Sequence, residues 1–416
     1  MLSTPWIIET FFSAEFAKVD GKVQLTVALT ELMWPYLAFV SIAALFQAVL
    51  NAHKIFGPSA FTPVLLNLAI IGCGVGLAEV FDSPAYGLVI GFLVGGIVQA
   101  AFQLPYIWRW TTSRFSLDFR FRHPQVRRVL VIMGPGIFAA GIYQINVFVS
   151  QLIASGLEGG SIASLQYGIR LQELVLGLFV VSIAQVILPT LSQQTARHDD
   201  AGVKETLSYA TGLMAYVTLP ATAGLILVGP EVVRLLFQFG EFDQRSVDMT
   251  VTALNFYAVG LFVIAAGRVY QQAFYAHKDL KTPTYVAFVS MVANIVLCVV
   301  LSEPLGHGGI ALAGSLSAFV AAVLLFIMLR RRLGPLDGPA LTWRVLRLLL
   351  ATGLMTASVI GLEHAWAPPA GRLALIAWLV VVITVAGSVF VISCRGLGVD
   401  ELGALWKSLG RKLRRS

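Results

Sequence analysis

Charged side chains are scarce in this 416-residue chain. Asp, Glu, Lys and Arg make up 12% of it, which is about half of the roughly 25% found in soluble domains. Hydrophobic residues make up 57%, and the mean hydropathy is +0.81. Many apolar runs approach or exceed the roughly 20 residues that a helix needs to cross a bilayer. The composition therefore excludes an ordinary soluble protein. It predicts an all-α polytopic membrane protein, because lipid-facing strands would alternate between polar and apolar residues.

Catalytic and metal-binding signatures are also absent from the sequence. There is no Walker A loop, no Gly-x-Ser-x-Gly and no His-Glu-x-x-His, and the six histidines do not cluster. Cys73, Cys298 and Cys394 have no metal-ligand spacing and suggest no disulfide. We therefore expect neither an enzyme nor an ATP-driven pump, and no cofactor. The first apolar stretch has no basic segment before it and no small-residue cleavage site after it, so no cleavable signal peptide is expected.

The long apolar segments predict about eleven membrane spans. Their expected limits are 25–52, 61–78, 85–107, 127–154, 162–188, 205–228, 247–275, 283–302, 308–329, 341–362 and 372–394. The net charge of +7 follows from the loops between them rather than from a nucleic-acid-binding patch. Most of the 29 Lys and Arg residues lie in alternate loops and the tail: 53–60, 108–128, 189–204, 276–282, 330–347 and the residues after 394. Cytoplasmic loops carry such an excess, so we expect this side and the C-terminus in the cytoplasm.

An internal repeat is visible in the sequence. Gln47 and Ala52-His53-Lys54 recur as Gln271 and Ala276-His277-Lys278, and Thr62-Pro63 and Gly87 recur as Thr282-Pro283 and Gly309. Duplicated lobes of this kind are typical of membrane transporters. The second copy has three expected spans before the span that holds Gln271, whereas the first copy has only the apolar stub 1–12. We therefore expect a complete version to carry an N-terminal extension and about fourteen spans.

The repeat and the charge pattern predict five segments. These are a truncated N-terminal lobe (1–107), a basic cytoplasmic linker (108–126), a C-terminal lobe of six spans (127–332), two extra spans (333–395) and a basic amphipathic tail on the cytoplasmic surface (396–416).

Ionisable residues inside the expected spans are the first candidates for a site. Arg170 and Glu173 are three residues apart, so they share one helix face and can pair. They either line a cavity, where the arginine binds an anionic head group, or form an ion pair that holds two helices together. Arg268 either lines the cavity or extends to the cytoplasmic interface. Glu31 lies in the first full span, where solvation at the outer interface is the favoured reading.

Uncharged polar residues and prolines give weaker signals. Gln144, Asn146 and Asn294 either coordinate a cation or ligand, or form interhelical hydrogen bonds, which is the commoner use of such residues. Pro35, Pro135 and Pro220 each interrupt an expected span, and Gly134-Pro135-Gly136 is the most helix-breaking cluster. Broken helices that line a cavity and passive kinks are both open readings of these prolines.

Several motifs resemble those of the MurJ/MviN lipid II flippases, over essentially the whole chain. They are Pro35-Tyr36, Leu50-Asn51, Ala60-Phe61-Thr62-Pro63-Val64-Leu65-Leu66-Asn67, Gly134-Pro135, Gln144-Ile145-Asn146, Gly160-Ser161-Ile162, Tyr167, Arg170-Leu171, Glu173, Leu188-Pro189-Thr190-Leu191-Ser192, Ala273-Phe274-Tyr275-Ala276, Asp279, Lys281, Thr282 and Pro283. The resemblance places the chain in the multidrug/oligosaccharidyl-lipid/polysaccharide exporter superfamily. It implies fourteen spans, in two six-span lobes and two C-terminal helices.

The resemblance also implies roles for single residues. Arg170 matches a cavity arginine thought to engage the lipid II pyrophosphate, Glu173 matches the acidic residue one turn on, and Arg268 stands where relatives carry lysine. This chain departs from the pattern in two ways. The family's other cavity arginines and an aspartate lie in first and second spans that this chain lacks, and residue 31 is Glu where relatives usually carry a basic residue.

The leading hypothesis is an inner-membrane flippase, or an incomplete copy of one, that moves undecaprenyl-pyrophosphate-linked peptidoglycan precursor from the cytoplasmic to the outer leaflet. We expect Arg170, Glu173, Arg268, Gln144 and Asn146 to bind the substrate. Transport would be driven by the membrane potential or a monovalent ion. The expected partners are the anionic lipid, the membrane and the cell-wall synthesis machinery, but no nucleic acid. The alternatives are a polysaccharide-repeat flippase or multidrug antiporter of the same superfamily, or an inactive membrane scaffold.

Overall fold

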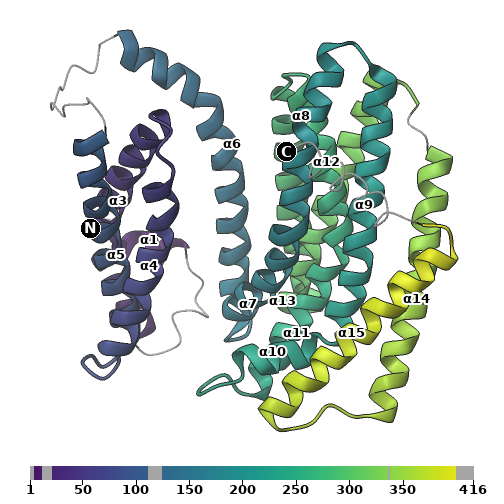
Figure 1. Ribbon diagram of the computed structural model, residues 1–416. Helices are drawn as coiled ribbons and strands as arrows, with labels where there is room; N and C mark the ends of the chain where they lie inside the picture. Colours follow the sequence, from purple (N-terminus) through teal and green to yellow (C-terminus); the bar gives the residue numbers. More distant parts are fainter. Residues whose placement is uncertain (1–3, 12–20, 111–123, 336–337, 400–416) are drawn as a thin grey trace. The chain divides into compact units, whose positions relative to one another are not determined.

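A computed structural model describes residues 4–11, 21–110, 124–335 and 338–399, all within helices or the turns that join them (Figure 1). The all-α membrane architecture expected from the sequence is confirmed. Eight of the described helices are long and apolar enough to span a membrane, or nine when α11 and α12 count as one bent span. Nine is two fewer than the eleven expected spans. One helix, α13, holds two expected spans, and α6 is not among the helices counted.

Contacts divide the chain into two units, Met1–Val131 and Ile132–Ser416. The division falls within the long helix α6 (Pro124–Ser155), whereas the sequence placed the start of the second lobe at residue 127. The predicted basic linker lies partly outside the described residues, as does nearly all of the predicted tail. The five-segment division stays a prediction.

The first unit is built on close contact between two helices. It contains α1 (Thr4–Phe11), α3 (Lys22–Ala52), α4 (Gly57–Gly76) and α5 (Ala85–Trp110). A Cβ added at Gly87 or Gly91 would lie 2.9 Å from the Cys73 carbonyl oxygen or 2.7 Å from the Ile70 Cα. Small residues at this spacing let two membrane helices approach backbone to backbone. Gln103 of α5 is fully buried and donates to the Ala43 carbonyl of α3 (3.1 Å).

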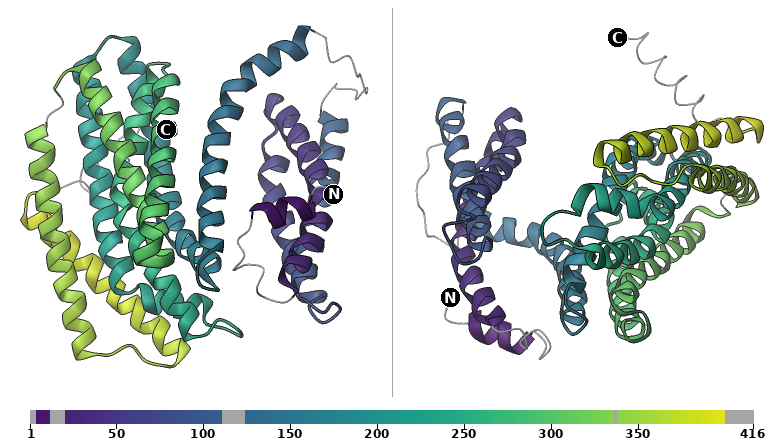
Figure 2. Two further views of the ribbon diagram at one scale, coloured as in Figure 1. Left: turned by 180° about the vertical axis from the view of Figure 1, so that it is seen from behind. Right: turned by 90° about the horizontal axis from the view of Figure 1, so that it is seen from below.

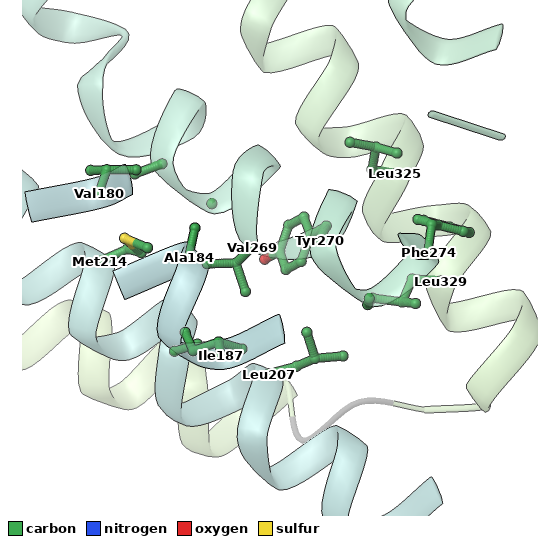
Figure 3. Packing of buried hydrophobic residues seen from close by; sticks show 14 of the residues in the cluster. Val180, Ala184, Ile187, Leu207, Met214, Val269, Tyr270, Phe274, Leu325 and Leu329 are labelled. Carbon is green, nitrogen blue, oxygen red and sulfur yellow. The ribbon is translucent and has the colours of Figure 1, made fainter. Parts of the chain in front are cut away.

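The second unit holds the remaining helices around several buried apolar clusters, of which one is much larger than the others. They are α7 (Ser161–Val175), the π-helical turn η1 (Leu176–Val181), α8 (Ser182–Ala196), α9 (Asp200–Leu227), α10 (Gly229–Phe237), α11 (Gln244–Val259), α12 (Leu261–Ala276), α13 (Lys281–Leu333), α14 (Gly338–Ala365) and α15 (Arg372–Gly396). Figure 3 shows core side chains from α8, α9, α12 and α13 meeting, among them Ile187, Met214, Val269 and Leu325. The helix α14 packs on α9, and α15 packs on α14 and crosses the unit obliquely (Figures 1 and 2).

The helix α13 is a hairpin of two antiparallel arms. Gly306 has φ 56° and ψ −137°, which is not helical, and Ser290 donates to the Ser317 carbonyl (2.9 Å) although 27 residues separate them. The arms, 281–305 and 307–333, correspond to the expected spans 283–302 and 308–329. Asp279 closes the open end of the hairpin by accepting hydrogen bonds from Thr282 and by pairing with Arg332 (3.3 Å). Partial burial raises the pKa of Asp279, but these contacts lower it by more, so the pKa lies below its usual value.

The sequence repeat has the same local structure in both copies. Lys54 and Lys278 both adopt the left-handed conformation that ends a helix (φ 61° and 58°). The next backbone N–H in each copy reaches back five residues, Ile55 to Leu50 and Asp279 to Phe274, both at 2.9 Å. This is the Schellman arrangement, in which a residue of positive φ satisfies the last carbonyls of a helix. Gly309 repeats the role of Gly87, since its added Cβ would meet the Leu301 carbonyl oxygen.

Of the two readings left open for the prolines, the structure does not show broken helices at Pro35, Pro135 or Pro220. Pro35 and Pro220 lie inside the continuous helices α3 and α9, and the backbone of α6 stays helical through residues 134–136. A proline removes one hydrogen-bond donor, and a long helix tolerates this loss as a kink. The interruptions occur elsewhere, at Gly260, in η1 and at Gly306.

Candidate functional site

A cavity of about 380 Å³ with both polar and apolar lining residues lies inside the second unit, between α6, α7, α11 and α13. Four of the five site residues expected from the sequence line it: Gln144 and Asn146 from α6, and Arg170 and Glu173 from α7. A neighbouring cavity of about 290 Å³ contains the fifth residue, Arg268 of α12. Asn146 lines both cavities. The structure thus brings all five residues to two adjoining cavities of one unit.

The orientation of Arg170 follows from how α7 packs. Leu165, Gly168 and Gln172 are among the buried residues of this helix. Gly168 allows close approach to α11, since its added Cβ would lie 3.2 Å from the Ala253 Cβ and the Leu254 nitrogen. With that face committed to α11, the opposite face of α7 carries Arg170 and Glu173 to the cavity.

Arg170 and Glu173 form an ion pair within one helix. The Nη1 of Arg170 lies 2.9 Å from the Oε2 of Glu173, and the two side chains are 70% and 45% exposed. The alternative in which this pair holds two helices together is therefore wrong, because both partners project from successive turns of α7. An exposed guanidinium with one nitrogen on Glu173 keeps its other donors available for an anion.

The amides on the opposite wall form an interhelical network. Asn294 of the first α13 arm is 2% exposed and donates to the Asn146 Oδ1 (2.8 Å) and to the Ser150 Oγ (3.2 Å). Ser317 of the second arm donates to the Asn294 Oδ1 (3.4 Å). Of the two readings left open by the sequence, interhelical hydrogen bonding is the role that the structure shows for Asn146 and Asn294. The network joins α6 to both arms of the hairpin.

Arg268 is half-buried on α12, beside Gln271, Ser290 and Asn146 in the second cavity. Within the described part of the chain, its guanidinium makes no hydrogen bond or ion pair, while Gln271 donates to the Tyr275 hydroxyl (2.7 Å). Arg268 therefore lines a cavity and supplies an unpaired positive charge to it.

The sequence reasoning missed two cavity residues, Gln151 and Gln166. Among the described residues neither has a hydrogen-bond partner, and the same holds for Gln144. Helical spacing could have found them. Gln166 precedes Arg170 by four residues on the same face of α7, and Gln151 follows Gln144 by seven on α6. The cavity therefore offers free amide groups beside one exposed guanidinium, which suits an anion with polar substituents.

Sequence comparisons with known proteins all indicate the same family. The model of a family described as lipid II flippase MurJ matches residues 1–394. The chain is 35% identical over 334 residues to a probable lipid II flippase MurJ of Treponema pallidum (strain Nichols), a match covering 80% of this chain and 62% of that protein. It is 34% identical over 340 residues to the corresponding protein of Vibrio cholerae serotype O1, covering 82% and 65%. The chain thus spans less than two thirds of the length of these relatives. A Rhizobium tropici relative is 30% identical over 419 residues, covering 99% of this chain and 78% of that protein.

Solved structures share the fold. A lipid II flippase MurJ in an inward closed conformation superposes with a TM-score of 0.79 at 23% identity, covering 95% of this chain and 80% of that one. An inward-facing multidrug resistance transporter of the MATE family, from the MOP superfamily, gives a TM-score of 0.68 at 16% identity, covering 82% and 77%.

Proposed function

Since this chain belongs to the lipid II flippase MurJ family, we propose that it moves undecaprenyl-pyrophosphate-linked peptidoglycan precursor from the cytoplasmic to the outer leaflet. The resemblance expected from the sequence is confirmed by the family match. The observation that carries the proposal is Arg170, an exposed arginine that lines a cavity within an apolar helical unit. In this proposal the chain binds and transports the lipid and does not convert it chemically.

The chemistry of the substrate explains the need for this cavity. A pyrophosphate carries negative charge, and an ion cannot enter hydrocarbon without partners that replace its water. A guanidinium can donate two parallel hydrogen bonds to phosphate oxygens. Arg170 supplies this fork, Arg268 adds a second positive charge in the adjoining cavity, and Gln144, Gln151 and Gln166 supply amides for the sugar and peptide portions.

The driving force proposed for the loaded step is the membrane potential. Moving an anion outward from a negative cytoplasm is favourable by roughly 2.3 kcal/mol per charge for each 100 mV. The empty cavity, with Arg170 and Arg268, carries positive charge and returns inward under the same field. Coupling to a monovalent ion is the second source of drive that we propose.

Location and orientation belong to the same proposal. We place the chain in the inner membrane, beside the cell-wall synthesis machinery, with its C-terminus in the cytoplasm, because basic residues are concentrated on one side. A membrane-impermeant maleimide applied to intact cells should label Glu158→Cys, in the turn before α7, and leave Arg122→Cys unlabelled. Permeabilised cells should label both positions. Labelling of position 122 in intact cells, with 158 protected, would reverse the orientation.

Reconstitution tests the function against its alternatives. The chain is inserted into vesicles whose inner leaflet holds fluorescent lipid-linked precursor, and transfer to the outer leaflet is followed by loss of fluorescence to an external quencher. We expect transfer to depend on the chain and to speed up when the vesicle interior is made negative. Transport of a cationic drug without movement of the lipid would favour the multidrug alternative. Movement of neither would favour a scaffold and contradict the proposal.

A further inference from the structure

Two spans of the second unit that pack against each other both depart from regular α-helix. The helices α11 and α12 meet at Gly260 with a bend of 43°. Beside this break, the span that begins with α7 passes through the π-helical turn η1 before it continues as α8. Leu176 and Val180 of η1 share a buried cluster with Ala258 and Leu261 on either side of the break. Interruptions of this kind often coincide with functional positions in helices.

The break is closed by side chains from three other helices. The Gly260 N–H donates to the Tyr257 carbonyl, three residues back (3.0 Å), so regular helical pairing ends here. Ser315 of α13 donates to the Phe256 carbonyl (2.7 Å), Gln172 of α7 to the Tyr257 carbonyl (2.5 Å), and Thr222 of α9 to the Ala258 carbonyl (3.0 Å). Three successive carbonyls thus each accept a hydrogen bond from another helix, as expected where buried backbone groups lose regular helical partners. We name these three side chains the collar.

Gly260 itself is held by close packing. A Cβ added there would lie 2.5 Å from the Ser315 Oγ and 3.1 Å from the Ser315 Cα, so the second arm of α13 touches the break directly. The collar and this contact fix the break at one place in the unit. The bend is therefore stabilised by specific contacts with the surrounding helices.

Gln172 is the collar residue on the helix that carries Arg170 and Glu173. It is 4% exposed and lies between Arg170 and Glu173 in the sequence of α7. Its hydrogen bond ties α7 to the last turn of α11, and Gly168 packs against the same helix one turn earlier. Beyond this point η1 interrupts the span, and α8 packs on α12 instead. The portion of the span that carries Arg170 is thus joined to α11, and the portion after η1 is joined to α12.

We propose that Gln172 is a positioning residue that couples the angle between α11 and α12 to the placement of Arg170 in the cavity. When that angle changes, α7 follows α11 through the bond from Gln172 to the Tyr257 carbonyl, and η1 absorbs the difference. The proposal rests on the proposed function of Arg170 as the anion-binding group. Ser315 and Thr222 stabilise the same break, but their hydrogen bonds go to α11 and none of those shown reaches α7, so in this proposal they hold the bend without positioning Arg170.

A cysteine reporter in the cavity tests this coupling. Gln166→Cys, one turn before Arg170, is introduced after Cys73, Cys298 and Cys394 have been replaced by Ala. Maleimide labelling of the purified chain is measured alone and with undecaprenyl diphosphate as the probe. The probe should protect the reporter, and the probe concentration for half protection serves as the affinity.

Matched variants then separate positioning from stability. Gln172→Met keeps the length and helix propensity of the side chain but removes the donor, whereas Ser315→Ala removes a donor from the same break on another helix. We expect Gln172→Met to change the labelling rate without probe by roughly three-fold and to weaken protection by roughly five-fold or more, the range for losing one such bond. Ser315→Ala should leave both within about two-fold at a similar loss of thermal stability.

The outcomes are distinguishable. If Gln172→Met and Ser315→Ala change the probe-free rate and the protection alike, Gln172 is structural and the coupling is overturned. If Arg170→Ala leaves protection unchanged, the proposed function of Arg170 fails instead. The probe-free labelling rates of the two variants still decide the coupling in that case, because they do not depend on the ligand.

Discussion

Arg170→Ala is expected to lower the affinity of the purified chain for undecaprenyl diphosphate by roughly 10- to 150-fold, the equivalent of about 1.5–3 kcal/mol for a hydrogen bond to a charged group. The Arg170 side chain is 70% exposed and lines a cavity of about 380 Å³, so its removal takes away a ligand contact without opening a hole in the core. Equilibrium binding of a fluorescent undecaprenyl diphosphate in detergent micelles measures the effect. Thermal stability should change little.

Graded substitutions sharpen this test. Arg170→Lys keeps the charge but loses the fork that contacts two phosphate oxygens, so it should recover only part of the affinity. Glu173→Gln should be milder still, because Glu173 orients the arginine from 2.9 Å and need not contact the anion. Arg245→Ala is the matched control: this arginine is 58% exposed and also pairs with a glutamate, Glu158, but it does not line the cavity. Equal affinities for Arg170→Ala and Arg245→Ala would remove Arg170 from the site.

The spans could be located from the sequence because hydropathy alone decides which segments enter the membrane. The positions at which the helices are interrupted could not be located in this way. Gly260, Gly306 and η1 arise where side chains from other helices satisfy the freed backbone groups, as Ser315 and Gln172 do at the α11–α12 break. Gly260 is one of 38 glycines, and nothing local distinguishes it. The prolines, which do stand out, lie inside helices that continue past them. The short helix α10 escaped prediction because its 9 residues are far fewer than a membrane span needs.

The sequence predicted several residues of the candidate site, but not how they are arranged in space. Spacing correctly paired Arg170 with Glu173, since residues three apart on a helix are neighbours. It did not reveal that the pair faces a cavity, because that depends on Gly168 packing against α11. Gln151 and Gln166 resemble any exposed glutamine until the opposing wall of the cavity is known. Asn294 and Asn146 were recognised as polar partners, but their direct bond (2.8 Å) follows from the fold of the hairpin.

Gly309→Ala should be among the most destabilising single substitutions in the second unit. The added Cβ would lie 2.0 Å from the Leu301 carbonyl oxygen and 2.4 Å from the Leu301 carbonyl carbon. Real Cβ atoms essentially never approach within 3.0 Å of another heavy atom, and a backbone carbonyl cannot rotate away as a side chain can. The two arms of α13 must therefore separate near their turn. We expect a cost of about 3 kcal/mol, at the upper end of overpacking, measured as a lower unfolding temperature in detergent.

The repeat provides a graded control for this prediction. Gly87→Ala, the counterpart in the first unit, places its Cβ 2.9 Å from the Cys73 carbonyl oxygen and should cost less than Gly309→Ala. Gly314→Ala, five residues further along the same arm, meets nothing closer than 3.8 Å and should be neutral or stabilising by about 0.5 kcal/mol, because alanine favours helix. Separation of the arms also pulls Ser317 from Asn294, so Gly309→Ala should loosen the wall of the cavity that holds Asn146. An unfolding temperature for Gly309→Ala equal to that of Gly314→Ala would show that the hairpin turn is not packed as described.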